Sequence, residues 1–490
     1  MYTLGIDVGS SSVKVSLLNL TNGKCVASAF YPSEEMPILA VKAGWAEQEP
    51  LQWWENMKNA LADVLKNAAI NKAEIKAIGI SYQMHGLVAL DKNGDVVRPS
   101  IIWCDSRAVE IGDKAFKELG SDYCLNSCLN SPGNFTASKL KWVKENEPEL
   151  YATIDKIMLP GDYIAYRLTG ERQTTVTGLS EGIMWDFKKE SVANDLFDYY
   201  GFSSDLIPEI VPVFSEQAKV SDTIAAELGI PAGIPVSYRA GDQPNNAFSL
   251  NVLEPGEVAA TAGTSGVVYG VNDRLARDEQ SRVNTFAHVN HNDEQKRLGV
   301  LLCINGTGIL NSWLRRNVAG GIDYPAMNDE AMKVSAGADG LLFYPFGNGA
   351  ERVLGNANPG AELKGLSFNI HNQSHVLRAA QEGIAFSFRY GVDIMGEMGI
   401  KTSVVRAGKA NMFLSPLFRQ TMANVLGAQI ELYDTDGALG AARGAALGAG
   451  LYKNASEAFD NLTCLETIQP NKEMNAVEDA YKNWRFNLKF

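Results

Sequence analysis

Runs of apolar residues, separated by short polar turns, predict strands at the start of the chain. Asn22-Gly23 is typical of a tight hairpin turn between two of them. Apolar residues at helical spacing over residues 50–69, begun by Glu49-Pro50, predict a helix. The predicted strands cover residues 2–7, 12–20, 24–31 and 75–81. The chain is therefore expected to open in the order β-β-β-α-β.

A similar order recurs in the second half of the sequence. The predicted strands there cover residues 256–262, 267–271, 403–407 and 428–433. The predicted helices cover residues 374–398, 416–426 and 439–451. Each half begins with a Gly/Ser/Thr turn between two strands, which indicates a distant structural repeat. We expect an α/β protein of two domains, 1–248 and 249–490, each a mixed β-sheet flanked by helices.

Composition narrows the classes of function. The chain has 490 residues, a net charge of −13 and six cysteines without metal-site spacing. The negative charge disfavours nucleic acid as a partner, and sparse cysteine is typical of a reducing compartment. The sequence shows neither a signal peptide nor a run of about 18 apolar residues, so we expect a cytoplasmic protein that does not enter a membrane. The oligomeric state stays open, and a homodimer is one candidate.

Two turns have the composition of phosphate-binding loops. In the first, Asp7 ends a strand and is followed by Gly9, Ser10 and Ser11. Glycine lets the backbone approach a ligand, amide and hydroxyl groups can surround a phosphate, and a carboxylate can hold Mg²⁺ through water. Gly263-Thr264-Ser265-Gly266 occupies the matching place in the second half. Either turn alone is equally compatible with a plain hairpin, but the pair favours nucleotide binding.

A third acidic residue has the position of a general base. Asp242, in Gly241-Asp242-Gln243, follows a predicted strand near the domain boundary. It is suited to accept a proton from an attacking hydroxyl in phosphoryl transfer. The alternative is that it only caps the following helix.

Two short segments after strands carry side chains suited to a sugar. Gln83 and His85 can both donate and accept hydrogen bonds. Trp103 can stack on the apolar face of a sugar, while Asp105 and Arg107 can bind its hydroxyls. The alternatives are an ordinary loop histidine and an exposed Asp–Arg ion pair. We also expect residues 101–103 to form a strand.

Other enzyme classes fit less well. The chain has neither a Gly-x-x-x-x-Gly-Lys-Ser/Thr loop nor a Gly-x-Gly-x-x-Gly motif after the first strand. Gly178–Gly182 matches the Gly-x-Ser-x-Gly pattern of hydrolases, but a predicted strand follows where that elbow needs a helix, so we interpret the match as chance. Residues 407–411 lie between a strand and a helix and are placed to hold an adenosine. The small residues of 437–446 indicate close helix packing.

In their order and spacing these motifs resemble the FGGY carbohydrate kinases over nearly the whole chain. The resemblance implies two actin-like (ribonuclease H-like) ATPase domains with a cleft between them. The N-terminal domain binds the sugar and the C-terminal domain binds ATP. Within the family, Gln83-Met84-His85-Gly86 and Trp103–Arg107 resemble the xylulokinases. The implied reaction is ATP-dependent phosphorylation of a ketopentose, D-xylulose to D-xylulose 5-phosphate.

The resemblance also assigns roles to residues. Asp242 is the implied catalytic base, and Asp7, through water, and Asp242 are the implied Mg²⁺ ligands. Taken together with the reasoning above, the predicted sugar-binding residues are Gln83, Met84, His85, Trp103, Asp105, Arg107, Asp242 and Gln243. The predicted nucleotide-binding residues are Ser10, Ser11, Lys14, Gly263, Thr264, Ser265, Gly408, Lys409 and Asn411.

Two departures from the family pattern affect the interpretation. The adenosine segment, usually Gly-Gly-Gly-Ala in the family, is Ala407-Gly408-Lys409-Ala410, which bears on nucleotide preference. Pro244-Asn245-Asn246 replaces the usual small residues after the base, a change expected to reshape the sugar pocket. The alternatives are a kinase for ribulose, sedoheptulose, gluconate or glycerol, and a non-catalytic sensor of sugar or nucleotide on the same fold.

Overall fold

The computed structural model describes residues 1–355 and 357–489, which form two compact units. The first unit consists of Met1–Asn251, Phe286–Leu298 and Thr435–Leu462, and the second holds the remaining described residues. The second half of the chain thus supplies two segments to the first unit. The domain bounds 1–248 and 249–490 stay a prediction, because units defined by contacts do not test a division along the sequence.

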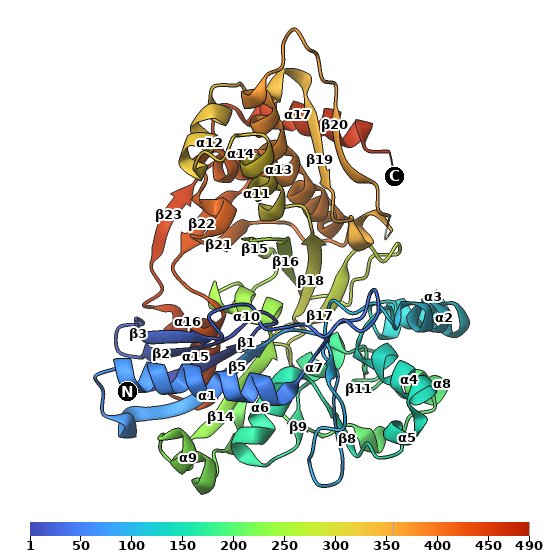
Figure 1. The fold of residues 1–490 in the computed structure, drawn as a ribbon, viewed down its shortest axis with the longest axis vertical. Coiled ribbons are helices and arrows are strands. Elements are labelled where there is room, and N and C mark those ends of the chain that lie inside the picture. Colours follow the sequence, from blue (N-terminus) through green and yellow to red (C-terminus); the bar gives the residue numbers. More distant parts are fainter. Residues whose placement is uncertain (356, 490) are drawn as a thin grey trace. The chain divides into compact units, whose positions relative to one another are not determined.

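A six-stranded mixed sheet forms the centre of the first unit (Figure 1). Its strands, in order, are β13 (Phe214–Lys219), β14 (Pro235–Gly241), β5 (Ile75–Tyr82), β1 (Tyr2–Val8), β2 (Val13–Asn19) and β3 (Cys25–Tyr31). The three central strands β14, β5 and β1 are parallel to one another, while β2 is antiparallel to β1 and β3 is antiparallel to β2. With helix α1 (Pro50–Asn67) between β3 and β5, the predicted β-β-β-α-β order is confirmed.

Two helices cover this sheet. Helix α1 packs on β2 and β3 through an apolar face that includes Trp54 and Met57, and Pro50 begins it at a position where no amide donor is needed. Helix α15 (Gly437–Gly448) packs on β1, β5 and β14. A Cβ on Gly5 would lie 1.8 Å from the Ala438 carbonyl oxygen. The close packing predicted from the small residues of this segment is therefore confirmed.

A seven-stranded sheet is built from strands of the second half of the chain. Its strands, in order, are β17 (Asn284–Ala287), β18 (Leu298–Ile304), β16 (Gly266–Asn272), β15 (Glu257–Ala262), β21 (Val404–Gly408), β22 (Gln429–Tyr433) and β23 (Cys464–Ile468). The strand order β18-β16-β15-β21-β22 matches the order β3-β2-β1-β5-β14 of the first sheet. In both sheets the first pair in the sequence, β15–β16 or β1–β2, is antiparallel, and the next two strands, β21 and β22 or β5 and β14, are parallel to β15 or β1. The predicted structural repeat is thus present in the topology.

Two helices of the second unit, α13 and α14, lie where the sequence predicts helices over residues 374–398 and 416–426, whereas α11, α12 and α17 were not predicted. Ser415 caps α14 and Gly427, at φ 61°, ends it, while Asn372 caps the long α13. The helices are α11 (Gly308–Asn317), α12 (Tyr324–Met332), α13 (Gln373–Glu397), α14 (Pro416–Leu426) and α17 (Met474–Asn487). The antiparallel pair β19 (Leu342–Phe346) and β20 (Gly360–Lys364) packs beside α13. Apolar side chains of these elements form the core of this unit.

The rest of the first unit consists of short elements between and after the central strands. Its helices are α2 (Val109–Leu119), α3 (Ser121–Ser127), α4 (Thr136–Asn146), α5 (Pro148–Tyr151), α6 (Pro160–Thr169), α7 (Val176–Glu181), α8 (Asn194–Tyr200), α9 (Asp222–Leu228), α10 (Asp242–Ser249) and α16 (Ala455–Phe459). Its short strands pair as β4 (Glu47–Gln48) with β7 (Ser100–Ile101), β6 (Val88–Leu90) with β8 (Lys156–Met158), β9 (Gln173–Thr174) with β12 (Glu209–Ile210), and β10 (Trp185–Asp186) with β11 (Ser191–Val192).

Two predictions concern these short elements. The strand predicted over residues 101–103 was placed too late, because β7 ends at Ile101 and Trp103 lies in a turn. The Gly178–Gly182 match lies within and just after helix α7, followed by β10, so the structure has no strand-to-helix elbow there. Among the described residues, none of the helices combines the length and apolar character that crossing a membrane requires.

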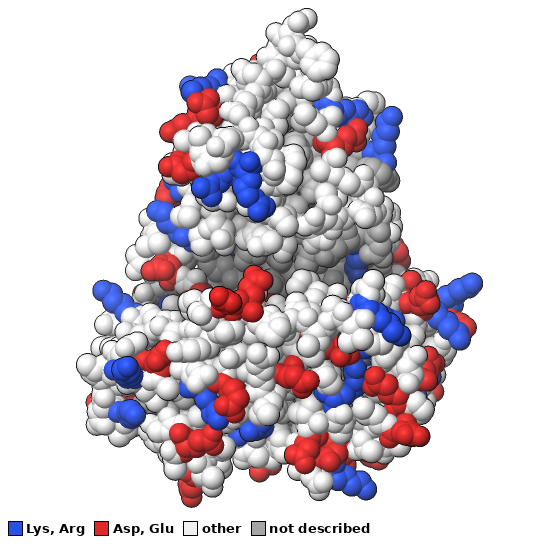
Figure 2. All heavy atoms as spheres, in the orientation of Figure 1, with Lys and Arg blue, Asp and Glu red and all other residues white. Residues whose placement is uncertain are grey.

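Charged side chains of both signs are interspersed on one face of the molecule (Figure 2). Figure 2 shows Lys and Arg interspersed with Asp and Glu on the face that it presents. Together with the net charge of −13, this distribution gives that face of the described residues no extended basic surface for a nucleic-acid backbone.

Candidate functional site

Two aspartates lie at one edge of the first unit's sheet. Asp7 is near the end of β1, and Asp242 directly follows β14 and begins α10. Because β1, β5 and β14 are parallel, their carboxyl ends meet at the same edge, where ligands bind in open α/β sheets. The topology therefore brings together the residues predicted as metal ligand and as base.

The two carboxylates disfavour each other's charge. Burial, and after it the charge of Asp7, raises the pKa of Asp242 from 3.8 to about 7. Burial also raises the pKa of Asp7, and the nearby Asp436 adds to that rise. Hydrogen bonds from Gln243 to Asp242 only partly offset the effect. A carboxyl that titrates near pH 7 is matched to general-base chemistry at neutral pH.

The pair also fits a hydrated divalent cation. Among the residues that the structure describes, no group of three His, Cys, Asp or Glu side chains could hold a metal ion. Two carboxylates that repel each other gain from a cation between them, and Mg²⁺ retains several water ligands when few protein ligands are offered. Asp7 and Asp242 therefore fit a divalent cation that keeps most of its water ligands.

The predicted sugar residues after β5 adjoin the same edge. A Cβ on Gly241 would lie 2.6 Å from Met84 Cγ, so Met84 contacts the residue before the base. His85 Nδ1 lies 2.9 Å from the backbone oxygen of Glu181. Because that oxygen can only accept, Nδ1 carries a proton and donates this hydrogen bond. The structure thus brings Met84, His85 and Asp242 together.

Aromatic side chains fix the His85 ring. The ring centroids of Phe135 and Phe286 lie 4.7 and 5.4 Å from it. Phe286 comes from the second half of the sequence, and the Ala287 amide that follows it donates to Ser180 Oγ at 2.9 Å.

Gln83 is 2% exposed and donates through Nε2 to Gln48, while its Oε1 has no hydrogen-bond partner among the described residues. The loop after β5 is therefore held rigidly at the sugar residues.

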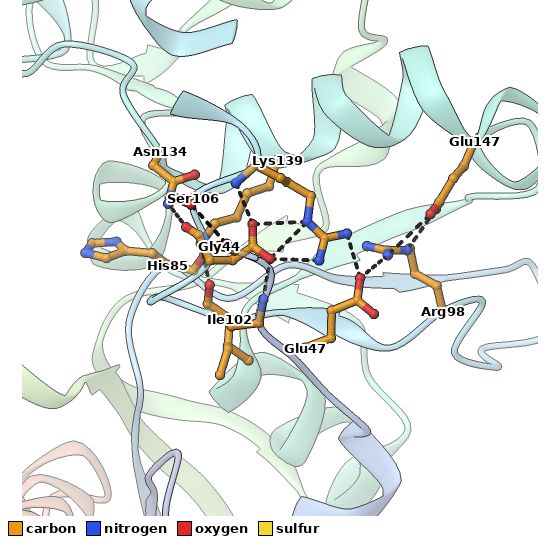
Figure 3. A network of polar contacts seen from close by, with 12 residues as sticks. Gly44, Glu47, His85, Arg98, Ile102, Ser106, Asn134, Lys139 and Glu147 are labelled. Atoms are coloured by element: carbon orange, nitrogen blue, oxygen red, sulfur yellow. Dashed lines mark hydrogen bonds and ion pairs between the residues drawn. The ribbon is translucent and has the colours of Figure 1, made fainter. Parts of the chain in front are cut away.

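Asp105 and Arg107 belong to a buried polar network, which continues to Glu47 and Arg98, labelled in Figure 3. The Arg107 side chain donates to both oxygens of Asp105 at 2.7–3.0 Å, and the Ala46 amide donates to Asp105 Oδ2 at 2.6 Å. The two side chains are 0% and 1% exposed, so the alternative of an exposed ion pair is wrong. Both carboxylate oxygens of Asp105 thus accept hydrogen bonds from the protein, and these bonds stabilise the loop that contains Asp105. Its predicted contact with a sugar, like that of Arg107, gains no support from these bonds and stays a prediction.

The same network continues through two more ion pairs. Arg107 Nη1 lies 2.7 Å from Glu47, and Arg98 joins Glu47 to Glu147 at 2.6 and 2.9 Å. These pairs hold the strands β4 and β7 and the loop that follows them. Trp103, in that loop, is 49% exposed, and an aromatic face open to solvent on a fixed loop is available for stacking.

The first predicted phosphate turn joins β1 to β2. The Gly9 amide donates to the Ser12 oxygen at 3.0 Å, which closes the turn around Ser10 and Ser11. Lys14, in β2, pairs with Asp436 at 2.6 Å, and both side chains are about one-third exposed. Asp436 also caps α15 through the Leu439 amide. The ammonium of Lys14, a predicted nucleotide-binding residue, is therefore paired with Asp436.

In the second unit the predicted nucleotide-binding segments are neighbours. The turn Gly263–Ser265 joins β15 to β16, and amides at the start of α11 donate to the carbonyl oxygens of Gly263 and Thr264 at 2.8 and 3.1 Å. A Cβ on Gly263 would lie 3.6 Å from Asn411 Nδ2. The structure therefore brings the turn beside the segment Gly408–Asn411 that follows β21.

Both departures from the family pattern have a structural account. Lys409 Nζ pairs with Glu466 at 3.1 Å, so the residue that replaces a glycine is anchored to the edge strand β23. Asn245 is 0% exposed and donates to the Gly437 carbonyl at 2.9 Å. Asn245 therefore links α10, which begins with the base, to the start of α15.

Sequence reasoning missed two buried groups near the site. Lys139, in α4, donates to the carbonyls of His85 and Ile102. Glu181 is 1% exposed, and a Cβ on Gly241 would lie 2.5 Å from its Oε2. Burial and the neighbouring Asp242 raise the pKa of Glu181 well above its usual range, and its Oε1 has no hydrogen-bond partner among the described residues. The available signal for Glu181 was that it is the one charged residue in 173–185, whereas Lys139, with Lys141 and Lys144 close by in the sequence, gave no such signal.

Comparison with known proteins places these features in a family. The models of the N-terminal and C-terminal domains of the FGGY family of carbohydrate kinases match residues 2–249 and 258–451. A xylulose kinase of Bacillus subtilis is 30% identical over 98% of this chain and 96% of its own. The crystal structure of a xylulose kinase from Rhodospirillum rubrum superposes with a TM-score of 0.89 at 26% identity, covering 99% of this chain and 98% of the other.

A third comparison shows how widely the fold is shared. A gluconate kinase from Lactobacillus acidophilus has a TM-score of 0.90 at 23% identity, over 99% of this chain and 97% of the other. The fold alone therefore does not choose the sugar. The expected architecture of two α/β domains with mixed sheets is confirmed by these structures and by the two sheets described above. The chain belongs to the FGGY family of carbohydrate kinases.

Proposed function

We propose that this carbohydrate kinase transfers the γ-phosphoryl group of ATP to the 5-hydroxyl of D-xylulose, giving D-xylulose 5-phosphate and ADP. The observation that carries the proposal is Asp242, a carboxyl with a pKa of about 7 placed beside Met84 and His85 at the sheet edge that also holds Asp7. Membership of the family supports the reaction type, and the similarity to xylulose kinases supports the choice of sugar.

The proposed chemistry follows from these positions. Above its pKa, Asp242 is ionised and accepts the proton of the 5-hydroxyl as that oxygen bonds to the γ-phosphorus. The bond from the γ-phosphorus to the β,γ-bridging oxygen breaks, and its electron pair leaves with ADP. His85 binds another sugar hydroxyl, and Met84 and Trp103 offer apolar surface to the carbon chain. Positioning and charge stabilisation supply most of the rate enhancement.

The remaining predicted residues are assigned to nucleotide and metal. Mg²⁺ bound to ATP supplies charge neutralisation at the phosphates, and Asp7 through water and Asp242 are the residues that would hold it. For the phosphates we propose Ser10, Ser11, Lys14, Gly263, Thr264 and Ser265, and for the adenosine Gly408, Lys409 and Asn411. We propose that the enzyme acts in the cytoplasm, where ATP is supplied. A homodimer remains the candidate assembly, to be tested by light scattering.

The test is a coupled assay of ADP release with a panel of acceptors: D-xylulose, D-ribulose, sedoheptulose, gluconate and glycerol. We expect D-xylulose to give a kcat/KM at least about tenfold above every other acceptor, a ratio equivalent to 1.4 kcal/mol of transition-state discrimination. Preference for another acceptor would overturn the assignment of the sugar but not the assignment of the reaction as ATP-dependent phosphorylation. Binding of sugar without ADP release from any acceptor would overturn the reaction and support the sensor.

A further inference from the structure

Lys139 is a buried cation that the proposed chemistry does not use. It lies in α4, is 0% exposed, and its Nζ donates to the carbonyl oxygen of His85 at 2.9 Å and to that of Ile102 at 3.0 Å (Figure 3). Among the described residues, Lys139 has no carboxylate within ion-pair distance; the nearest acidic group, Asp105, is occupied by Arg107 and the Ala46 amide.

Burial of this ammonium is unfavourable by itself. Desolvation lowers the pKa of Lys139 from 10.5 to about 7, although Asp105 and the Cys104 thiol favour its charged form. An apolar side chain of the same length would fill the space without that cost. The two carbonyl contacts are therefore what the lysine provides that an apolar residue cannot.

The two carbonyls belong to the two loops of the sugar site. His85 is itself a predicted sugar ligand, and Ile102 directly precedes Trp103. His85 has φ 63°, a backbone conformation that is unfavourable for a residue other than glycine. A hydrogen bond to its carbonyl holds the loop in this conformation. On the other loop, the Ile102 amide donates to Ala46 at 3.1 Å, so Ile102 is fixed on both sides.

We propose that Lys139 is a positioning residue for the sugar site, whose ammonium joins the loop of His85 to the loop of Trp103 and thereby sets the affinity for the sugar. The identity of the sugar rests on the proposed function, but the positioning role does not. Lys139 contacts backbone oxygens only, so it acts through His85 and Trp103 and not on the reacting atoms.

The protonation state of Lys139 gives the role a distinctive signature. Charge-assisted hydrogen bonds are about twice as strong as neutral ones, so the link weakens when the ammonium loses its proton. The charged form of Lys139 is favoured by Asp105, Cys104 and Glu181 and disfavoured by Arg107. The imidazole of His85 is a further titratable group, on the residue whose carbonyl oxygen accepts from Lys139. Sugar affinity should therefore fall as pH rises through about 7, whereas the affinity for ATP should not follow the same curve.

The decisive variant is Lys139→Met, which keeps the length of the side chain and removes its donors. We expect the KM for the sugar to rise about tenfold or more, the loss expected when one to two hydrogen bonds disappear. Between pH 6.5 and 9 it should vary less than in the wild type, because only the titration of Asp242 remains. The KM for ATP should stay within about twofold. The matched control is Lys141→Met on the same helix, where a half-buried lysine pairs with Glu145. In this control the KM for the sugar should stay within about twofold of the wild-type value at each pH.

Three results with Lys139→Met would overturn the proposal: an unchanged sugar KM, equal rises in the KM for sugar and for ATP, or a pH dependence of the sugar KM that is the same as in the wild type. If Lys139→Met does not fold, Lys139→Gln, which keeps a neutral donor, is measured in the same way. A wild-type sugar KM that stays constant between pH 6.5 and 9 would also overturn it. If wild-type protein turns over no acceptor, the proposed function fails, and the same comparison is made on the dissociation constant of D-xylulose by calorimetry.

Discussion

Replacement of Asp242 with Asn tests the base and its electrostatic setting in one variant. The side chain keeps its shape but can no longer accept the hydroxyl proton. Loss of a general base lowers kcat by about 10²–10⁴-fold, equivalent to about 3–5 kcal/mol of transition-state stabilisation. Binding of D-xylulose should persist, because Met84, His85 and Trp103 are unchanged.

The same substitution should stabilise the protein without ligand. A pKa raised from 3.8 to about 7 means that folding disfavours the ionised form, with an upper limit of about 4 kcal/mol above pH 7. Partial solvent exposure reduces that figure, and loss of a negative charge at the start of α10 removes about 0.5–1 kcal/mol of helix-dipole stabilisation. A net gain of about 1–2 kcal/mol remains, or about 2–6 °C in Tm.

The sign of the effect fixes its dependence on pH. Below pH 3.8 the carboxyl is protonated in both folded and unfolded chains, so the variant has no advantage. The penalty on the wild type develops between pH 4 and 7 and is complete above pH 7. Thermal unfolding of both proteins in the absence of sugar, nucleotide and Mg²⁺ measures it, with calorimetry for D-xylulose binding. A variant that is less stable at pH 8, or that retains kcat within tenfold, would refute this electrostatic account of Asp242.

Three further pairs of substitutions give distinct results. Gly79→Ala should destabilise the first unit by about 3 kcal/mol or more in thermal unfolding, because its Cβ would lie 2.0 Å from a backbone oxygen of α15. Gly396→Ala, whose Cβ would have nothing within 4 Å, should stabilise the protein by about 0.5–1 kcal/mol in the same measurement. Glu181→Gln should retain kcat/KM for the sugar within about threefold, and Glu181→Ala should lower it tenfold or more in the ADP-release assay, because it leaves a cavity behind Met84 and the base. Lys14→Met should raise the KM for ATP about tenfold, while Asp436→Asn, which keeps the helix cap, should lower it by no more than about fivefold.

Elements with strong local patterns could be predicted from the sequence. Asn22-Gly23 defines the hairpin between β2 and β3, and Pro416 after Ser415 marks the start of α14. Their order was sufficient to predict the repeat of mixed sheets, because short connections and parallel crossovers leave few topologies. The position of Asp242 after a buried strand, and of Asp7 near the end of another, indicated a shared edge for the same reason.

Contacts between distant segments could not be predicted. Lys139 reaches the carbonyls of His85 and Ile102 across 54 and 37 residues, and no local pattern records such a distance. Asp105 and Arg107 were interpreted as ligands or an exposed pair because their burial depends on Glu47 and Ala46, which precede them by more than 50 residues. The inclusion of residues 435–462 in the first unit is likewise a matter of packing.

The most direct test of the central claim is the rate of ADP release with D-xylulose, ATP and Mg²⁺, measured for the wild type and for Asp242→Asn at pH 7.5. The account predicts sugar-dependent turnover by the wild type, with D-xylulose 5-phosphate as the product by mass spectrometry, and a kcat at least a hundredfold lower in the variant with D-xylulose still bound. ADP release that is independent of sugar, or turnover by Asp242→Asn equal to that of the wild type, would contradict it.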